Sequence, residues 1–174
     1  MDAMTSDLWL AEFEDAAEAP GVAGGAAVGP GWLGSLCRVW AAEGPAPWRR
    51  YACAEASPGP AWQRLSPLIS LPGASAAAVP GCHYVVETDV EPGHEADFDA
   101  WYTQEHLPGL AAVPGTVHAA RYVRQGSPRF LALYLLTDPQ VLGSPPWLAV
   151  RGTPWSDRVR PRFRNTRRLM FHAA

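Results

Sequence analysis

The stretch HYVVETDV (residues 83–90), followed by EADFDAWYTQEHL (95–107), decides the fold that we expect. The first stretch is rich in valine, which favours β-strands. Glu91-Pro92-Gly93 ends this strand, and acidic residues then crowd the start of the second stretch, where a helix dipole favours negative charge. Because proline pushes the residue before it out of the helical region, we expect the helix to end at Pro108-Gly109.

Two more strands follow this helix, over residues 116–124 (TVHAARYVR) and 129–137 (RFLALYLLT). The turn Gln125-Gly126-Ser127-Pro128 joins them as a hairpin. A short helix near 147–150 and a last strand over 162–171 complete the order β-α-β-β-α-β. This order is typical of the split βαβ or ferredoxin-like unit and predicts the α+β fold class.

The first half of the chain repeats this pattern in reduced form. A shift of 75 residues aligns LWLAEFE (8–14) with HYVVETD (83–89) and pairs Glu12 with Glu87. Later landmarks align at a shift of 84, so the first copy is nine residues shorter between its first two strands. Because Glu87 recurs as Glu12, we interpret both as structural residues.

The nine missing residues fall in the long helix. What remains, residues 16–28, is mostly alanine and glycine and is too broken for a long amphipathic helix. We therefore expect two ferredoxin-like repeats in one chain that close into an α+β barrel. Residues 1–80 would be a degenerate half with a linker, and 81–174 a complete half.

The basic residues of the chain are all arginine, and their distribution is uneven. The 174 residues carry fourteen arginines, no lysine and a net charge of −3, which excludes lysine-based covalent chemistry. Residues 151–174 hold seven arginines against one acidic residue. We interpret this run as the solvated face of a strand rather than a nucleic-acid site, since the acidic body would repel phosphates.

Cysteine spacing and hydropathy exclude further classes of protein. Cys37, Cys53 and Cys82 have no metal-ligand spacing, so we expect neither a disulfide framework nor a metal site. Prolines and glycines interrupt the apolar segment 19–34, which is therefore neither a signal peptide nor a membrane span. These patterns favour a cytoplasmic protein that makes no contact with membranes.

The second half carries a recognisable motif. It consists of Glu91-Pro92-Gly93-His94-Glu95, then Trp101-Tyr102-Thr103-Gln104-Glu105-His106-Leu107-Pro108, then Val113-Pro114-Gly115. With these residues, the run from Tyr84 to Phe171 resembles the dimeric α+β barrel superfamily and, within it, EthD-like and related uncharacterised bacterial proteins. The resemblance covers about half the chain. This sequence departs from the common pattern because both halves would lie in one chain.

The resemblance implies a barrel closed by two ferredoxin-like sheets, with a pocket between the long helix and the sheet of each half. Members of the superfamily include cofactor-independent monooxygenases, polyketide cyclases, muconolactone-type isomerases, haem-binding enzymes and proteins of no known activity. The resemblance also implies that His106 lines the pocket. Because proteins of this fold have several unrelated functions, the fold alone does not identify the function of this chain.

His106 is the strongest catalytic candidate on the helix. Phe98, Tyr102 and His106 are spaced i, i+4 and i+8, and Trp101 and Glu105 flank them, so one helix face carries rings and an imidazole. Near a helix C-terminus the dipole favours the protonated imidazole. The alternative is a buried histidine that merely caps the helix.

Strand residues supply further candidates. Tyr134 on one strand, with Arg121 and Tyr122 on another, are expected to reach the same cavity and to polarise a substrate oxygen. Asn165 shares its predicted strand face with Phe163, so we expect it to point toward apolar surroundings and to bind either a ligand or the protein itself.

These residues favour a small-molecule enzyme without an organic cofactor. We expect cyclase, isomerase or lyase chemistry on an apolar oxygenated substrate, such as a polyketide or aromatic intermediate. The alternatives are a non-catalytic barrel that binds a hydrophobic ligand or a protein partner, and a cofactor-free or haem-dependent monooxygenase. The chain would be a monomeric pseudo-dimer or a homodimer. The predicted catalytic residues are His106, Tyr102, Arg121 and Tyr134, and the predicted substrate-binding residues are Phe98, Trp101, Glu105, Tyr122 and Asn165.

Overall fold

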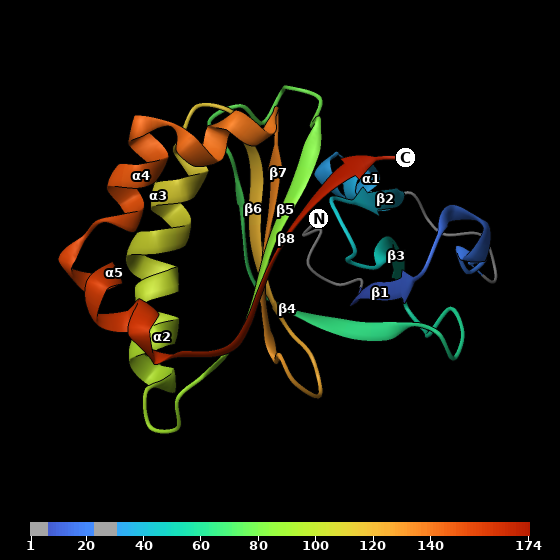
Figure 1. The fold of residues 1–174 in the computed structure, drawn as a ribbon, viewed down its shortest axis with the longest axis horizontal. Helices are drawn as coiled ribbons and strands as arrows, with labels where there is room; N and C mark the ends of the chain where they lie inside the picture. Colours follow the sequence, from blue (N-terminus) through green and yellow to red (C-terminus); the bar gives the residue numbers. More distant parts are fainter. Residues whose placement is uncertain (1–6, 23–30) are drawn as a thin grey trace.

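A computed structural model describes residues 7–22 and 31–174 and has an antiparallel, eight-stranded closed barrel at its centre (Figure 1). The α+β class predicted from the sequence is confirmed. The strands are β1 (Asp7–Phe13), β2 (Val39–Ala42), β3 (Trp48–Ala54), β4 (Gln63–Pro72), β5 (Cys82–Val90), β6 (Thr116–Val123), β7 (Phe130–Leu136) and β8 (Phe163–Ala173).

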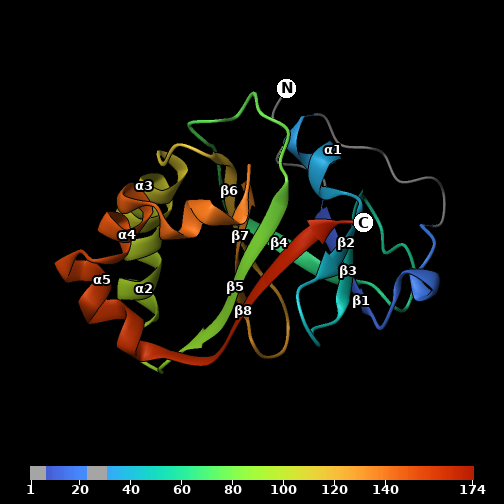
Figure 2. The same ribbon diagram turned by 45° about the horizontal axis from the view of Figure 1, so that its top comes forward.

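Around the barrel the strands follow the order β1-β3-β2-β8-β5-β7-β6-β4. Each half of the chain supplies four neighbouring strands, arranged fourth, first, third, second. Antiparallel pairs β2–β8 and β4–β6 join the two sets of four. Figure 2 shows β8 crossing from the helical side of the molecule to its contact with β2.

Helices cover the two halves unequally. The short helix α1 (Trp32–Leu36) belongs to the first half, whereas four α-helices pack outside the sheet of β5, β6, β7 and β8 (Figure 1). These are α2 (Glu95–Trp101), α3 (Leu107–Ala111), α4 (Pro145–Arg151) and α5 (Pro154–Val159), with a π turn at Tyr102–His106 and 3-10 turns at Ala16–Glu18, Pro139–Gly143 and Arg160–Arg162. No helix within the described residues is long and apolar enough to cross a membrane.

The alternation of side chains along β5 separates two cores. Val85 and Glu87 point into the barrel, where they join an interior built from both halves of the chain. Tyr84 and Val86 point to the other face, toward the helices. Any site between helix and sheet in the second half therefore lies outside the barrel.

The long helix differs from its prediction at its C-terminal end. It does not stop at Pro108 but continues to Ala111, because it widens into a π turn over Tyr102–His106. Pro108 then lies in the first turn of the α3 segment, where proline is tolerated. A second helix that the sequence did not predict, α5, follows the expected one at α4.

The reduced helix of the first half is only partly described. Residues 16–18 form one 3-10 turn, and 23–28 lie outside the described residues, as does Pro30. The three cysteines are free thiols, and the Sγ atoms of Cys37 and Cys53 lie 3.2 Å apart. The described part of the chain contains no cluster of three or more metal-ligating side chains.

Candidate functional site

A cavity lies between the long helix and the sheet of the second half. Its walls are largely aromatic. The aromatic lining residues are Tyr84, Trp101, Tyr102, Tyr134, Trp147 and Phe163. The cavity is small and narrow, and with its open mouth it holds about 370 Å³ of empty space. It therefore suits a small, flat, largely apolar molecule.

The π turn determines which helix residues face this cavity. In an α-helix, residues five positions apart point about 140° away from each other around the axis. A π turn closes its hydrogen bond at i+5, here from the Leu107 N–H to the Tyr102 carbonyl. Trp101 and His106 consequently stack, with ring centroids 4.1 Å apart and planes inclined by 21°. Tyr102 meets the same imidazole edge-on at 5.4 Å.

His106 is a neutral, unsatisfied base in this cavity. The residue is 7% exposed, and its Nδ1 atom is buried without a hydrogen-bond partner among the described residues. Burial lowers the pKa of His106 to about 3, with further contributions from the positive charges of Arg160, Arg151 and Arg121. The predicted preference for the protonated form is wrong, because the helix runs on past His106 and burial outweighs the dipole.

The tyrosines of the cavity are hydrogen-bond donors. Burial raises the pKa of Tyr102 to about 12 and that of Tyr134 well above its ordinary value. Both hydroxyl groups therefore stay protonated at neutral pH. Tyr134 packs edge-on against Trp147, with ring centroids 5.4 Å apart. Such hydroxyls can donate to an oxygen on which negative charge develops.

Three arginines complete the lining of the cavity. Arg151 ends α4, Arg160 lies in the 3-10 turn that follows α5, and Arg168 lies on β8. Among the residues that the structure describes, no acidic side chain lines the cavity with them. We expected the whole arginine run to form a solvated strand face, so this set was not among the predicted site residues. No local pattern in the sequence separates these three arginines from those that pair with acids.

The structure brings four of the nine predicted residues to the cavity, namely His106, Tyr102, Trp101 and Tyr134. Two more lie directly behind them. The Arg121 guanidinium stacks over the Tyr102 ring at 4.2 Å and donates to Asp99, and Phe98 packs edge-on against Tyr102 at 5.1 Å. Arg121 and Phe98 therefore support the wall of the cavity without lining it.

The remaining three predicted residues lie elsewhere. Glu105 accepts a hydrogen bond from Thr153 and so ties the turn before α5 to the long helix. Tyr122 faces the barrel interior, because adjacent strand residues point to opposite faces and Arg121 takes the helix side. The expectation that Asn165 is buried among apolar groups is wrong. A bulge in β8 opposite Thr88 turns it outward, where its amide donates to Asp89.

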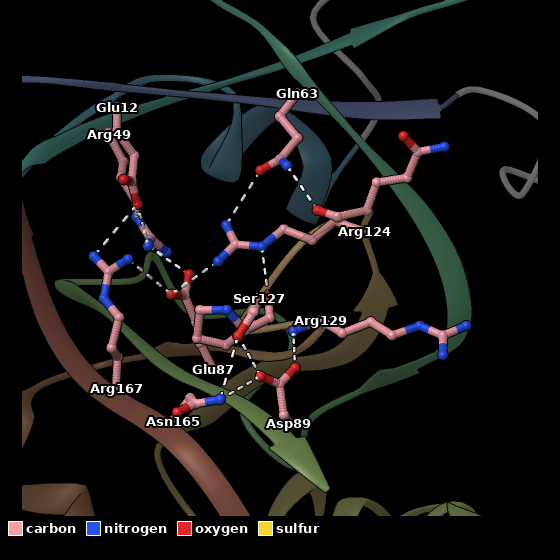
Figure 3. A network of polar contacts seen from close by, with 12 residues as sticks. Glu12, Arg49, Gln63, Glu87, Asp89, Arg124, Ser127, Arg129, Asn165 and Arg167 are labelled. Carbon is pink, nitrogen blue, oxygen red and sulfur yellow. Dashed lines mark hydrogen bonds and ion pairs between the residues drawn. The ribbon is translucent and has the colours of Figure 1, made fainter.

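A second polar cluster lies inside one end of the barrel (Figure 3). Arg49 is fully buried and donates to Glu12, with Nε 3.1 Å from Oε1, and to Glu87. Arg124 and Arg167 approach the other carboxylate oxygen of Glu87 at 3.4 and 3.3 Å. Each of these arginines has an acidic partner, and Nη1 of Arg49 is the buried atom of this cluster without a hydrogen bond to the described residues. Because its charges are paired within the protein, we interpret the cluster as a structural network.

No family model matches the chain, and no curated protein sequence matches it. Solved structures do match it. The heme-degrading enzyme LmHde from Listeria monocytogenes superposes with a TM-score of 0.62 and 9% identity over 97% of this chain and 99% of its own. A monooxygenase-like protein from Listeria innocua gives 0.63 and 9% over 98% and 94%.

A third match is described as an uncharacterised ferredoxin fold protein related to antibiotic biosynthesis monooxygenases, from Listeria monocytogenes. Its TM-score is 0.59 at 9% identity, over 98% of this chain and 95% of its own. The fold is therefore ferredoxin-like. The neighbours overturn the predicted cyclase, isomerase or lyase function, since their descriptions are of monooxygenase-like proteins and a heme-degrading enzyme. That prediction was wrong because acid/base side chains in an apolar pocket serve oxidation equally well.

Proposed function

We propose that this chain is a cofactor-independent monooxygenase that acts on a small aromatic molecule in the cavity beside His106. The observation that carries this proposal is a neutral imidazole, with a buried and unpartnered Nδ1, in a cavity walled by aromatic rings. An apolar cavity favours both an aromatic substrate and molecular oxygen over water. The monooxygenase-like neighbours lend independent support.

The chemistry needs only a base and an oxygen-binding group from the protein. His106 would take a proton from an acidic methylene group of the substrate, while the hydroxyl of Tyr102 or Tyr134 donates to the adjacent oxygen. The carbanion then transfers electrons to molecular oxygen and forms a hydroperoxide, which recovers the proton from His106. Loss of water gives a ketone. One oxygen atom becomes the carbonyl oxygen of the product and the other leaves as water, so the two methylene hydrogens depart in that water molecule.

A haem group does not fit this cavity. A neutral imidazole such as His106 is a suitable iron ligand, and arginines could accept propionates. The macrocycle, however, is four pyrrole rings wide, whereas the whole cavity with its open mouth holds about 370 Å³ of empty space. We therefore derive no step through haem.

We also propose that the chain consists of two fused repeats, 1–80 and 81–174, with the EthD-like motif in the second. The shared strand order of the two halves supports this proposal. So does the meeting of Glu12 and Glu87, which occupy matching positions in the two repeats, at one arginine, Arg49. Closure of the barrel within one chain favours a monomeric pseudo-dimer.

The test is oxygenation of compounds that contain an acidic methylene group. Purified protein would be incubated with 2-indanone or anthrone under ¹⁸O-labelled molecular oxygen, and the ketone product analysed by mass spectrometry. We expect one ¹⁸O atom per product molecule and no hydrogen peroxide. His106→Gln should slow turnover by about 10²–10⁴-fold, because glutamine cannot accept the proton.

The matched control is His94→Gln. His94 lies just before α2 and is exposed at the surface, outside the cavity, so this variant should retain the wild-type rate. Equal rates for His106→Gln and wild type would refute the role of His106 as base. A product without ¹⁸O would refute monooxygenation.

A further inference from the structure

The three arginines of the cavity differ from most other arginines of the second half. Six of the other seven form an ion pair with an acidic side chain, namely Arg121, Arg124, Arg158, Arg162, Arg164 and Arg167. The seventh, Arg129, lies apart from the cavity. Arg151, Arg160 and Arg168 form none with any acid in the described ranges 7–22 and 31–174, yet all three line one cavity. They come from three different elements, so tertiary structure brings them together.

These three charges repel one another. Burial lowers the pKa of Arg160, and the charges of Arg151 and Arg168 lower it further. Arg151 and Arg160 are each half-buried, so solvent screens their repulsion only in part. The chain as a whole has a net charge of −3, so acidic residues are plentiful, but none lines this cavity. An uncompensated cationic cluster beside an aromatic wall is the arrangement expected for binding an anion.

We propose that Arg151, Arg160 and Arg168 bind a carboxylate on the substrate, which makes the substrate an aromatic carboxylate. Its ring would lie against the aromatic wall and its carboxylate would face the arginines. The inference about substrate class rests on the proposed function, but the binding site itself stands without it. A carboxylate is preferred to a phosphate because it is planar and compact, which suits the narrow cavity.

The same arrangement links substrate binding to the strength of the base. Arg160 and Arg151 are the leading charged groups that weaken His106 as a proton acceptor. Tyr84, Tyr102 and Tyr134 are the remaining titratable groups that line the cavity, and all three stay neutral there. A bound carboxylate would neutralise the arginines and so make the imidazole a stronger base. His106 would then accept a proton more readily when a substrate of the correct charge is bound, and less readily, but still measurably, from a neutral one.

The test compares 2-naphthoate with its neutral analogue 2-naphthamide by isothermal titration calorimetry. We expect 2-naphthoate to bind and 2-naphthamide to bind at least tenfold more weakly. Arg160→Gln and Arg168→Gln should each weaken 2-naphthoate binding by about 10- to 100-fold, the usual cost of losing a charge-assisted hydrogen bond. NMR titration should show a higher pKa for His106 in the complex.

Arg158→Gln is the matched control, because Arg158 lies two residues from Arg160 but is exposed and pairs with Asp97. This variant should bind 2-naphthoate as wild type does. Equal binding of the acid and the amide, or equal affinities of Arg158→Gln and Arg160→Gln, would overturn the proposal. Binding of 2-naphthyl phosphate without binding of 2-naphthoate would overturn the assignment to carboxylates.

The two proposals fail in different ways. Arginine-dependent binding of 2-naphthoate without any oxygenation would refute the monooxygenase and leave the anion site standing. Oxygenation of the neutral 2-indanone at the same rate in wild type and Arg160→Gln, with no binding of 2-naphthoate, would refute the anion site and leave the monooxygenase standing.

Discussion

Two clusters of arginines in the chain differ in how their positive charge is compensated. At one end of the barrel, Arg49 is fully buried between Glu12 and Glu87 (Figure 3). At the cavity, Arg151 and Arg160 are half-buried without an acidic partner in the described chain. In the first cluster, acidic side chains of the protein pair with every arginine, and the network stabilises the fold. In the second, a bound ligand would have to supply the negative charge.

Two histidines repeat this contrast. His83 lies inside the barrel, donates from Nδ1 to the carbonyl oxygen of Tyr134, and accepts at Nε2 from the Tyr51 hydroxyl, 2.9 Å away. Burial lowers its pKa to about 3, as it does for His106. His83 therefore has both ring nitrogens occupied, whereas His106 has one buried nitrogen without a partner in the described part of the chain. We therefore interpret His83 as a structural histidine and His106 as one that can act as a base.

The largest effect on stability is expected at Arg49. Arg49→Ala would leave the carboxylate of Glu87 buried with weaker compensation, so we expect unfolding to require about 3–5 kcal/mol less free energy. Urea denaturation measures this loss. Arg64→Ala is the control, because Arg64 forms an ion pair with Asp7 but its side chain is 59% exposed, and it should cost less than about 1 kcal/mol. Similar losses in the two variants would contradict the structural role of Arg49.

A smaller effect is expected from His106 as pH falls. In the unfolded chain a histidine binds a proton below about pH 6.5, whereas folded His106 does so only near pH 3. The unfolded state therefore binds more protons between these values, and stability falls as pH falls. From pH 7 to pH 5 this one residue should contribute about 2 kcal/mol to the loss.

Urea denaturation of wild type and His106→Gln at both pH values isolates that contribution. The variant should lose about 2 kcal/mol less than wild type over this interval, because glutamine does not titrate. Identical pH dependence would mean that folded His106 is protonated as readily as a histidine in water, and would contradict its role as a buried neutral imidazole.

The smallest effect on stability is expected at Arg160. Arg160 is repelled by its neighbours and has no acidic partner within the described ranges, so its loss would leave no carboxylate unpaired. Arg160→Gln should therefore change the free energy of unfolding by no more than about 0.5 kcal/mol. The thermal midpoint should stay the same or rise slightly. A loss as large as that of Arg49→Ala would show that the cavity arginines hold the fold together, and the comparison between the two clusters would break.

The strands and the helical face of the second half could be predicted because their signals are local. The spacing of Tyr102 and His106 and the β-branched strands are properties of neighbouring residues, and the structure places these groups at one cavity. The π turn carries no comparable sequence signal, so the end of the helix was misplaced. Asn165 was misplaced for a similar reason, since one bulge reverses the face of every residue beyond it.

The arginines of the cavity could not be predicted from local patterns at all. Arg168 lies on a strand, whereas Arg151 and Arg160 lie in short helices that fold back over the sheet. Some arginines of this run form ion pairs with acidic residues and others do not. The folding back of the helices decides which, and sequence spacing does not. Arg162 and Arg164 meet Glu91, and Arg160 is repelled by Arg151 and Arg168.

The π turn at Tyr102–His106 makes the cavity sensitive to the length of the helix as well as to its composition. Such a turn accommodates one residue more than an α-turn. Removing a single codon there would leave a regular α-helix in which Trp101 and His106 stand four positions apart and still share one face. Adding a codon would instead place them six positions apart, and neither an α-helix nor a single π turn brings such residues to the same side. A one-codon insertion beside an exposed position such as Thr103 would thus abolish the site while leaving every cavity residue encoded.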